Sequence, residues 1–260
     1  MTTGEQAWKE WHEAREQELA ADFGWLTLTS FQWLSHNPAR IEGLPGQWST
    51  NGSSADITVD ESFGLLMFDD GQPVDGTVTS SLREGQSLMW VRRGDIAAEL
   101  AVRNQAYAIR TRDNNAETRT RFEGVPTFDY SDDWVLNARF QAYPAPQMEN
   151  IKSVREDIPL IAEAVGEVVF EVDGAEHRLR AEAKDDGGLT LNFHDATNGD
   201  ATAAWRFVQT SAPEEDGSVV LDFNRTLNYP FAFTDFGACP APMNANRLAL
   251  SVPAGEKKPV

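Results

Sequence analysis

Cysteine is almost absent from this chain of 260 residues, which contains only Cys239. A single cysteine excludes an intrachain disulfide framework and is typical of proteins that fold in a reducing compartment. No apolar run approaches the roughly 20 residues that cross a bilayer. Residues 1–20 also lack the basic start and apolar stretch of a secretory signal. We therefore expect a cytoplasmic protein that does not bind membranes.

Positive charge is also scarce. The chain has 22 lysines and arginines against 41 aspartates and glutamates, and its formal net charge at pH 7 is −19. Nucleic acids and anionic membranes are bound through basic surfaces, so this acidic protein is predicted to bind neither. The acidic composition indicates either high solubility or a salty habitat.

Standard catalytic motifs are missing as well. The sequence has no glycine-rich phosphate loop before a helix, no H-E-x-x-H, no C-x-x-C and no G-x-S-x-G elbow. The histidines are scattered singly and lack the spacing of a zinc site; they are His12, His36, His177 and His194. We therefore predict no metal site and no cofactor, and we find no paired nucleophile and base.

What the sequence does contain is a series of short β-strand patterns. Turn residues separate short segments throughout residues 40–143, as in a sandwich or barrel. Residues 134–141 alternate apolar and polar side chains, which is the pattern of a half-buried strand. Residues 5–20 differ, because Trp8 and Trp11 belong to a stripe with helical spacing. The sequence predicts a mainly β protein with two sandwich-like or barrel-like halves and an N-terminal helix.

Four parts are expected along the chain. Prolines at both ends of residues 144–165, together with mixed patterning between them, indicate a connection between the two β halves. The parts are an N-terminal helix with an apolar entry segment at 1–34, a first β half at 35–143, the connection at 144–165, and a second β half at 166–260, which includes the C-terminal motif loop.

The last forty residues concentrate polar side chains beside prolines that restrict the backbone. A predicted strand at 218–224 leads into a loop, and another strand is expected at 246–252. The residues singled out as candidate ligand contacts or catalytic groups in this stretch are Asp222, Asn224, Arg225, Asn228, Asn246, Arg247, Glu256 and Lys257.

Arg206 and Asp222 allow two interpretations of this stretch. If their strands are neighbours, the two side chains pair, because a buried arginine requires a carboxylate, and the polar residues knit the loop to the barrel. Alternatively, Arg206, Arg225 and Arg247 surround a pocket and bind a carboxylate or phosphate through paired hydrogen bonds. In that case the asparagines orient the ligand, and Glu256 and Lys257 close the rim.

Three functions are compatible with these patterns. The first is binding of a small anionic ligand at the C-terminal loop and Arg206. The second is a hydrolase or isomerase in which Asp222 or Glu256 acts as general base. The third is an interaction module, in which the tryptophan-bearing face of the N-terminal helix binds a partner or a second copy in a homodimer.

The C-terminal segments also resemble a known family. LDFNR, N-x-P-x-A-F, C-P-x-P-x-x-x-N-R-L and A-G-E-K are similar to the signature of the bacterial and archaeal family called domain of unknown function 1684. Earlier matches are FGWLTLTSFQWL, the set Arg103, Arg110 and Asp113, and the set Asp195, Thr197, Gly199 and Arg206. The resemblance runs from about residue 8 to 257. It implies no activity, because the family is defined without one.

The chain departs from the family pattern at two places. Phe231 stands where the family usually has a second cysteine, which removes a disulfide or a two-thiolate metal site with Cys239. The family's T-Y-G-x-G-R segment reads ATAAWR at residues 201–206, so the tyrosine hydroxyl is lost. The resemblance therefore puts any mechanism that needs that hydroxyl in doubt here.

Overall fold

The computed structural model describes residues 2–259, and the chain divides into two compact units. Unit 1 comprises Met1–Gln17, Glu123–Phe233 and Ala238–Val260, and unit 2 comprises Glu18–Phe122 and Thr234–Gly237. The fold is mainly β, with a barrel-like half and a sandwich half, as the sequence predicts. The division between the units differs from the expected one, since it does not fall within residues 144–165.

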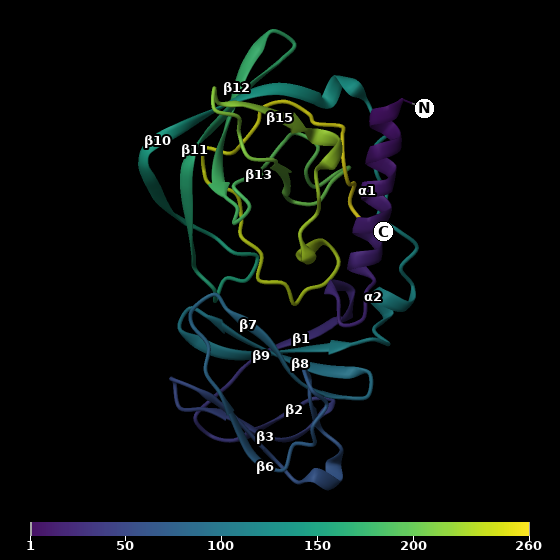
Figure 1. Cartoon of the computed structure of the whole chain (residues 1–260), viewed down its shortest axis with the longest axis vertical. Coiled ribbons are helices and arrows are strands. Elements are labelled where there is room, and N and C mark those ends of the chain that lie inside the picture. Colours follow the sequence, from purple (N-terminus) through teal and green to yellow (C-terminus); the bar gives the residue numbers. More distant parts are fainter. Residues whose placement is uncertain (1, 260) are drawn as a thin grey trace. The chain divides into compact units, whose positions relative to one another are not determined.

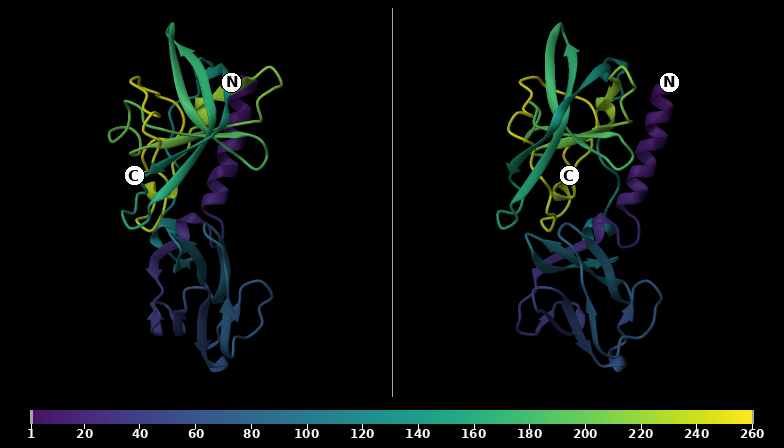
Figure 2. Two further views of the ribbon diagram at one scale, coloured as in Figure 1. Left: turned by 90° about the vertical axis from the view of Figure 1, so that its left-hand side faces the viewer. Right: turned by 60° about the vertical axis from the view of Figure 1, so that its left-hand side comes forward.

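Unit 1 is built on a six-stranded antiparallel sheet in the order β14-β13-β12-β11-β10-β15. The sheet curls into a half-barrel, so that the edge strands β14 and β15 come into contact, and the β11–β12 hairpin projects from it (Figures 1 and 2). Phe170, Phe193 and Phe223 pack ring against ring in its core. The strands are β10 (Val135–Ile151), β11 (Leu160–Val172), β12 (Ala175–Ala183), β13 (Leu189–Phe193), β14 (Arg206–Thr210) and β15 (Ser218–Asp222).

The segment at 144–165, expected as a connection, is instead mostly paired strand. β10 and β11 face each other from Arg139 opposite Val169 to Ile151 opposite Leu160, with an irregularity between Ala142 and Gln147. The prolines at 144 and 146 lie inside this irregularity. A bulge tolerates proline because the missing N–H is not needed for the ladder. Prolines that indicate a loop in the sequence therefore mark a bulge in a long strand.

Unit 2 is a two-sheet sandwich. Its sheets have the orders β1-β9-β8-β7-β5 and β2-β3-β4-β6. Trp48 from the smaller sheet meets Trp90 from the larger one edge to face, with ring centroids 5.7 Å apart. The strands are β1 (Leu28–Trp33), β2 (Ala39–Ile41), β3 (Leu44–Thr50), β4 (Ala55–Val59), β5 (Leu66–Met67), β6 (Gly76–Ser80), β7 (Ser87–Arg93), β8 (Ile96–Arg103) and β9 (Ala106–Asp113).

The predicted N-terminal helix is present as α1 (Thr3–Leu19). Its face with Trp8 packs on unit 1, and the side chain of Trp8 is only 7% exposed. The other helical segments are short: η1 (Trp25–Thr27), η2 (Glu61–Phe63), α2 (Glu117–Thr120), η3 (Asp132–Trp134), η4 (Phe223–Arg225) and η5 (Pro230–Ala232). Within residues 2–259, no helix combines the length and the apolar character needed to cross a bilayer.

The C-terminal segment of unit 1, yellow in Figure 1, passes along the half-barrel without forming a regular strand. The strand expected at 246–252 is absent, although Leu248 N–H donates to His194 O and Leu250 O accepts from Ala196 N–H. These main-chain bonds follow the residues just beyond β13 and do not extend the sheet. Side-chain hydrogen bonds therefore also hold this segment in place.

Candidate functional site

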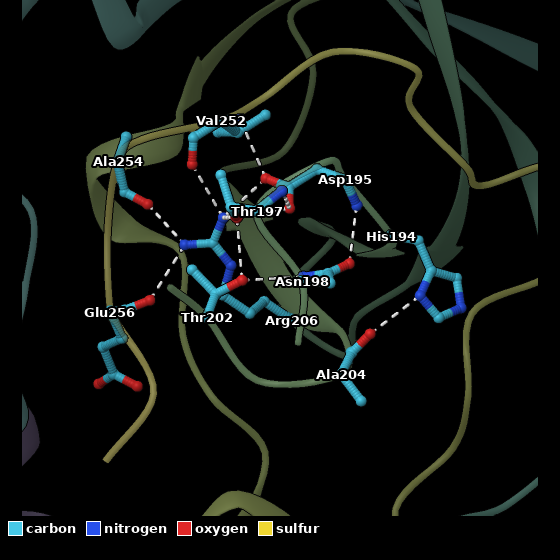
Figure 3. A network of polar contacts seen from close by, with 10 residues as sticks. All are labelled: His194, Asp195, Thr197, Asn198, Thr202, Ala204, Arg206, Val252, Ala254 and Glu256. Carbon is cyan, nitrogen blue, oxygen red and sulfur yellow. Dashed lines mark hydrogen bonds and ion pairs between the residues drawn. The ribbon is translucent and has the colours of Figure 1, made fainter. Parts of the chain in front are cut away.

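Arg206, the first residue of β14, is fully buried and fastens the C-terminal segment to the half-barrel (Figure 3). Its Nη1 donates to the main-chain oxygens of Ala254 at 2.6 Å and Glu256 at 3.0 Å. Its Nη2 donates to Val252 O at 3.0 Å and to Asp195 Oδ2 at 2.9 Å. Burial lowers the pKa of Arg206, and the neighbouring carboxylate of Asp195 opposes that effect. The arrangement is a structural clamp.

The partner of Arg206 is therefore Asp195, which corrects the expected pairing with Asp222. β14 and β15 are the two edge strands of the sheet and share no hydrogen-bond ladder. Asp222 instead caps η4, accepting hydrogen bonds from the main-chain N–H of Asn224 at 3.0 Å and from its amide Nδ2 at 2.9 Å. Asp222 also lies 3.4 Å from Arg225 Nε.

The side chains of Asn224 and Asn246 are also held by the chain itself. The amide of Asn224 bonds to both the N–H and the oxygen of Ser131, at 3.0 and 2.9 Å. The amide of Asn246 accepts from Arg180 N–H at 2.7 Å and donates to Arg180 O and Asn192 O, at 2.9 and 2.8 Å. Both asparagine side chains therefore bond to main-chain groups at places where neighbouring strands or loops diverge.

The remaining cationic candidates lie in different surroundings. The guanidinium of Arg225 is partly exposed and lies 5.2 Å from the centroid of the Trp11 ring. Lys257 Nζ lies 4.7 Å from the centroid of the Phe128 ring. Arg247 is exposed. Arg206, Arg225 and Arg247 therefore do not have the shared environment that a three-arginine pocket requires.

A second polar cluster lies between α1 and the C-terminal segment and is centred on Glu256, which is 1% exposed. Glu256 Oε2 accepts from the main-chain N–H of Asn228 at 2.6 Å. Glu256 Oε1 lies 3.6 Å from Arg15 Nε and 3.9 Å from His12 Nε2. Gly255 precedes it with a φ of 76°, and a side chain there would collide with the main chain of Thr226. This glycine allows the close approach that places Glu256.

Five buried polar atoms without a hydrogen-bond partner among the described residues belong to this cluster. A main-chain bond from Glu256 N–H to Thr226 O and a bond from the side-chain Nη2 of Arg15 to Asn228 O connect these residues. Buried polar atoms nearly always have partners, and ordered water is a common partner where protein groups are lacking. The atoms are His12 Nε2, Arg15 Nε, Thr226 Oγ1, Asn228 Oδ1 and Glu256 Oε1.

Burial also controls the charge of the cluster. It raises the pKa of Glu256, and the nearby Arg15 opposes that effect. It lowers the pKa of His12, and the carboxylate of Glu16 opposes that effect. Both shifts favour the neutral forms of the side chains. Arg15 then supplies the positive charge of the cluster.

Sequence reasoning found Asn228 and Glu256 but not His12 and Arg15 as members of the site. The signal that could have found the helix residues is their spacing. His12, Arg15 and Glu16 follow Trp8 at intervals that place all four toward one side of a helix. Polar and ionisable residues beside a buried tryptophan indicate that the packed face is not purely apolar.

A model of the family described as Protein of unknown function (DUF1684) matches residues 120–257, more than half of the chain. The chain belongs to this family. No curated protein matches the DUF1684 chain. Among solved structures, it is similar to the solution NMR structure of an uncharacterised protein from Haloarcula marismortui, with 27% sequence identity and a TM-score of 0.45. That similarity covers 54% of the DUF1684 chain and 78% of the other.

The departures from the DUF1684 pattern have structural counterparts. Trp205 stands at the second glycine of T-Y-G-x-G-R, and Phe231 stands at the second cysteine. Their rings pack against each other at a tilt of 41°, with centroids 4.3 Å apart. Thr202 stands at the tyrosine, and its hydroxyl accepts from Asn198 Nδ2 at 2.9 Å beside the Arg206 clamp. An aromatic pair and a threonine thus occupy these positions.

Proposed function

We propose that this protein binds a small anionic ligand carrying a carboxylate, at the cluster of His12, Arg15, Thr226, Asn228 and Glu256. The observation that supports this most directly is the concentration of buried polar atoms without partners around Arg15. Such a set is costly to bury unless something completes its hydrogen bonds. The site belongs to the C-terminal motif through Asn228 and Glu256, and α1 supplies its positive charge.

The available donors favour an anion. Arg15 Nε has no hydrogen-bond partner within 3.5 Å among the described residues, and the nearest acceptor, Glu256 Oε1, lies 3.6 Å away. Burial raises the pKa of Glu256, and in its protonated form the Glu256 hydroxyl is a further donor. A ligand carboxylate can accept from both, and a hydroxyl or amine beside that carboxylate can donate to Asn228 Oδ1. The ligand class that satisfies most of these atoms is a small hydroxy or amino acid.

Thermal unfolding against a panel of small hydroxy acids, amino acids and their neutral amides tests this proposal. A ligand at a hundred times its dissociation constant adds about 2.7 kcal/mol to stability. We expect one acid to stabilise the wild type, while its amide does not. Arg15→Gln should lose the stabilisation, and Arg225→Gln, a change of the same charge at a more exposed arginine, should keep it. Equal stabilisation of both variants, or none of the wild type by any acid, would refute the proposal.

A second candidate function is proton transfer by Glu256 in a hydrolase or isomerase. The observation that favours it is a buried carboxyl with a raised pKa 3.9 Å from a histidine nitrogen, since such shifts concentrate at catalytic groups. Glu256→Gln is expected to retain ligand-induced stabilisation and to abolish turnover of the ligand that the panel identifies. Asp222→Asn, which changes a helix cap, is the matched control.

A further inference from the structure

One face of the five-stranded sheet in unit 2 carries buried charge. Glu99 from β8 and Arg110 and Arg112 from β9 lie on the face opposite the sandwich core, and all three are buried. Arg110 Nη2 lies 2.5 Å from Glu99 Oε1, and Arg112 Nε donates to Glu99 Oε2 at 2.7 Å. Two guanidinium groups therefore share one carboxylate among the described residues, and Arg112 Nη1 also donates to the main-chain oxygens of Phe23 and Gly24, at 3.0 and 2.7 Å.

A third arginine, Arg103, adds positive charge on the solvent side of this group. Arg103 Nη2 donates to Ser87 Oγ at 3.0 Å, and Arg110 Nη2 donates to the same oxygen at 2.7 Å. The exposed Glu84 is the other carboxylate near Arg103, and it is already held by the main-chain N–H groups of residues 104 and 105. We call Ser87, Glu99, Arg103, Arg110 and Arg112 the arginine face.

The arginine face has unused donors. Arg110 Nε is buried without a hydrogen-bond partner among the described residues, and the residue is 4% exposed. Ser87 Oγ accepts from two arginines, so both lone pairs are used and its own proton is free to donate. Burial lowers the pKa of Arg110 to about 10, and the carboxylate of Glu99 opposes that effect. The Cζ atoms of Arg110 and Arg112 lie 5.6 and 4.9 Å from the centroid of the Trp25 ring.

We propose that the arginine face is an oxyanion-binding site, distinct from the cluster around Glu256. It takes a carboxylate or phosphate group. The anion accepts hydrogen bonds from Arg110 Nε, Arg103 and the Ser87 hydroxyl, and it adds negative charge beside the arginines. Ser87 is exposed, so the anion reaches the arginines from that end. The site lies outside residues 120–257, the part that the family model matches.

Titration calorimetry of the full chain with inorganic phosphate and with succinate tests this inference. We expect the wild type to bind at least one of the two, which also distinguishes a phosphate site from a carboxylate site. Ser87→Ala and Arg103→Gln, both nearer the solvent than Arg110, should weaken binding about tenfold each, because each removes one charge-assisted or hydroxyl donor. Arg121→Gln removes the same charge from an exposed residue of unit 2 and should leave the dissociation constant unchanged.

Two results would overturn the inference. One is the absence of binding by either anion to the wild type. The other is an equal loss in Arg121→Gln, which would attribute binding to overall charge. Arg15→Gln separates the two sites, because it should remove the stabilisation proposed for unit 1 and leave phosphate or succinate binding at the arginine face intact.

Discussion

The indole Nε1 of Trp8 donates a hydrogen bond to the main-chain oxygen of Asn224 at 2.7 Å, across 216 positions of sequence. Trp8 also stacks on His12, one helical turn later, with ring centroids 5.7 Å apart and an angle of 20° between the planes. The contact therefore does two things: it anchors α1 on unit 1, and it positions the histidine that faces Glu256. Packing and the candidate site depend on the same tryptophan.

Trp8→Ala is expected to destabilise the protein by about 3–5 kcal/mol, because it removes a large buried ring and leaves a main-chain oxygen without its donor. Trp11→Ala is the matched control, since Trp11 lies on the same helix but is only half-buried. Urea denaturation of the three proteins measures the difference. Equal losses of unfolding free energy in the two variants would show that the hydrogen bond to Asn224 adds no stability.

Arg206 and Asp195 should behave as a coupled buried pair. Arg206→Met leaves a buried carboxylate uncompensated and removes the clamp on Val252, Ala254 and Glu256, so we expect a loss of about 3–5 kcal/mol. The double variant Arg206→Met with Asp195→Leu should lose less than the sum of the two single changes, because it leaves no unpaired charge. A double-mutant cycle from urea denaturation checks this, and additive losses would contradict the pairing.

The fold class could be predicted because strand alternation and turn residues are local signals, but the pairing of Arg206 could not be read from alternation alone. Alternation gives the face of a residue and leaves the order of the strands open. In the structure, Arg206 lies opposite Phe193 in the β13–β14 pair, and Asp195 follows two residues later. Consecutive strands are usually neighbours. A carboxylate just after β13, the strand before β14, was therefore a better candidate partner for Arg206 than Asp222.

The candidate site could be predicted only where its residues lie in the C-terminal motif. Asn228 and Glu256 are in that motif, whereas His12 and Arg15 come from a helix more than 200 positions earlier. Their approach depends on how α1 packs, which local patterns do not specify. Asn246 illustrates the opposite case: a polar residue expected to orient a ligand instead satisfies the main chain of two strands.

Asn246 should be essential for stability. β12 and β13 pair directly only at Glu182 opposite Thr190 and Ala183 opposite Leu189, and the Asn246 amide bridges them where they diverge. Asn246→Ala removes the partner of three buried or part-buried main-chain groups, so we expect a loss of about 2 kcal/mol.

Asn246→Asp separates this bridging role from simple packing. It keeps an acceptor for Arg180 N–H but turns a carboxylate toward two carbonyl oxygens, and it should destabilise the protein further. Asn244→Ala, at an exposed position two residues earlier, is the control. Unfolding curves for the three variants test this ranking, which fails if Asn246→Ala is as stable as Asn244→Ala.

The ionisable groups of the Glu256 cluster predict how stability depends on pH. Burial raises the pKa of Glu256 above its usual value of 4.5, so the folded protein holds that proton more tightly than the unfolded chain. The stability contributed by this group is complete below pH 4.5 and is lost as pH rises through the folded-state pKa. His12 acts in the opposite direction: its pKa lies below 6.5, so its contribution is present above pH 6.5 and is lost as pH falls through the folded-state pKa.

Glu256→Gln isolates the first of these effects, because glutamine resembles the protonated carboxyl and does not titrate. The free energy of unfolding of the wild type should fall relative to that of Glu256→Gln as pH rises from 4.5, and the two curves should run parallel below that value. Denaturation at a series of pH values measures the difference, and Glu16→Gln, on the more exposed side of His12, is the control. If the wild type instead gains on Glu256→Gln as pH rises, the ionised form is the one that the fold stabilises. In that case the charge of Arg15 outweighs the effect of burial on Glu256. The ionised Glu256 would then repel a ligand carboxylate, which would contradict the proposed ligand class.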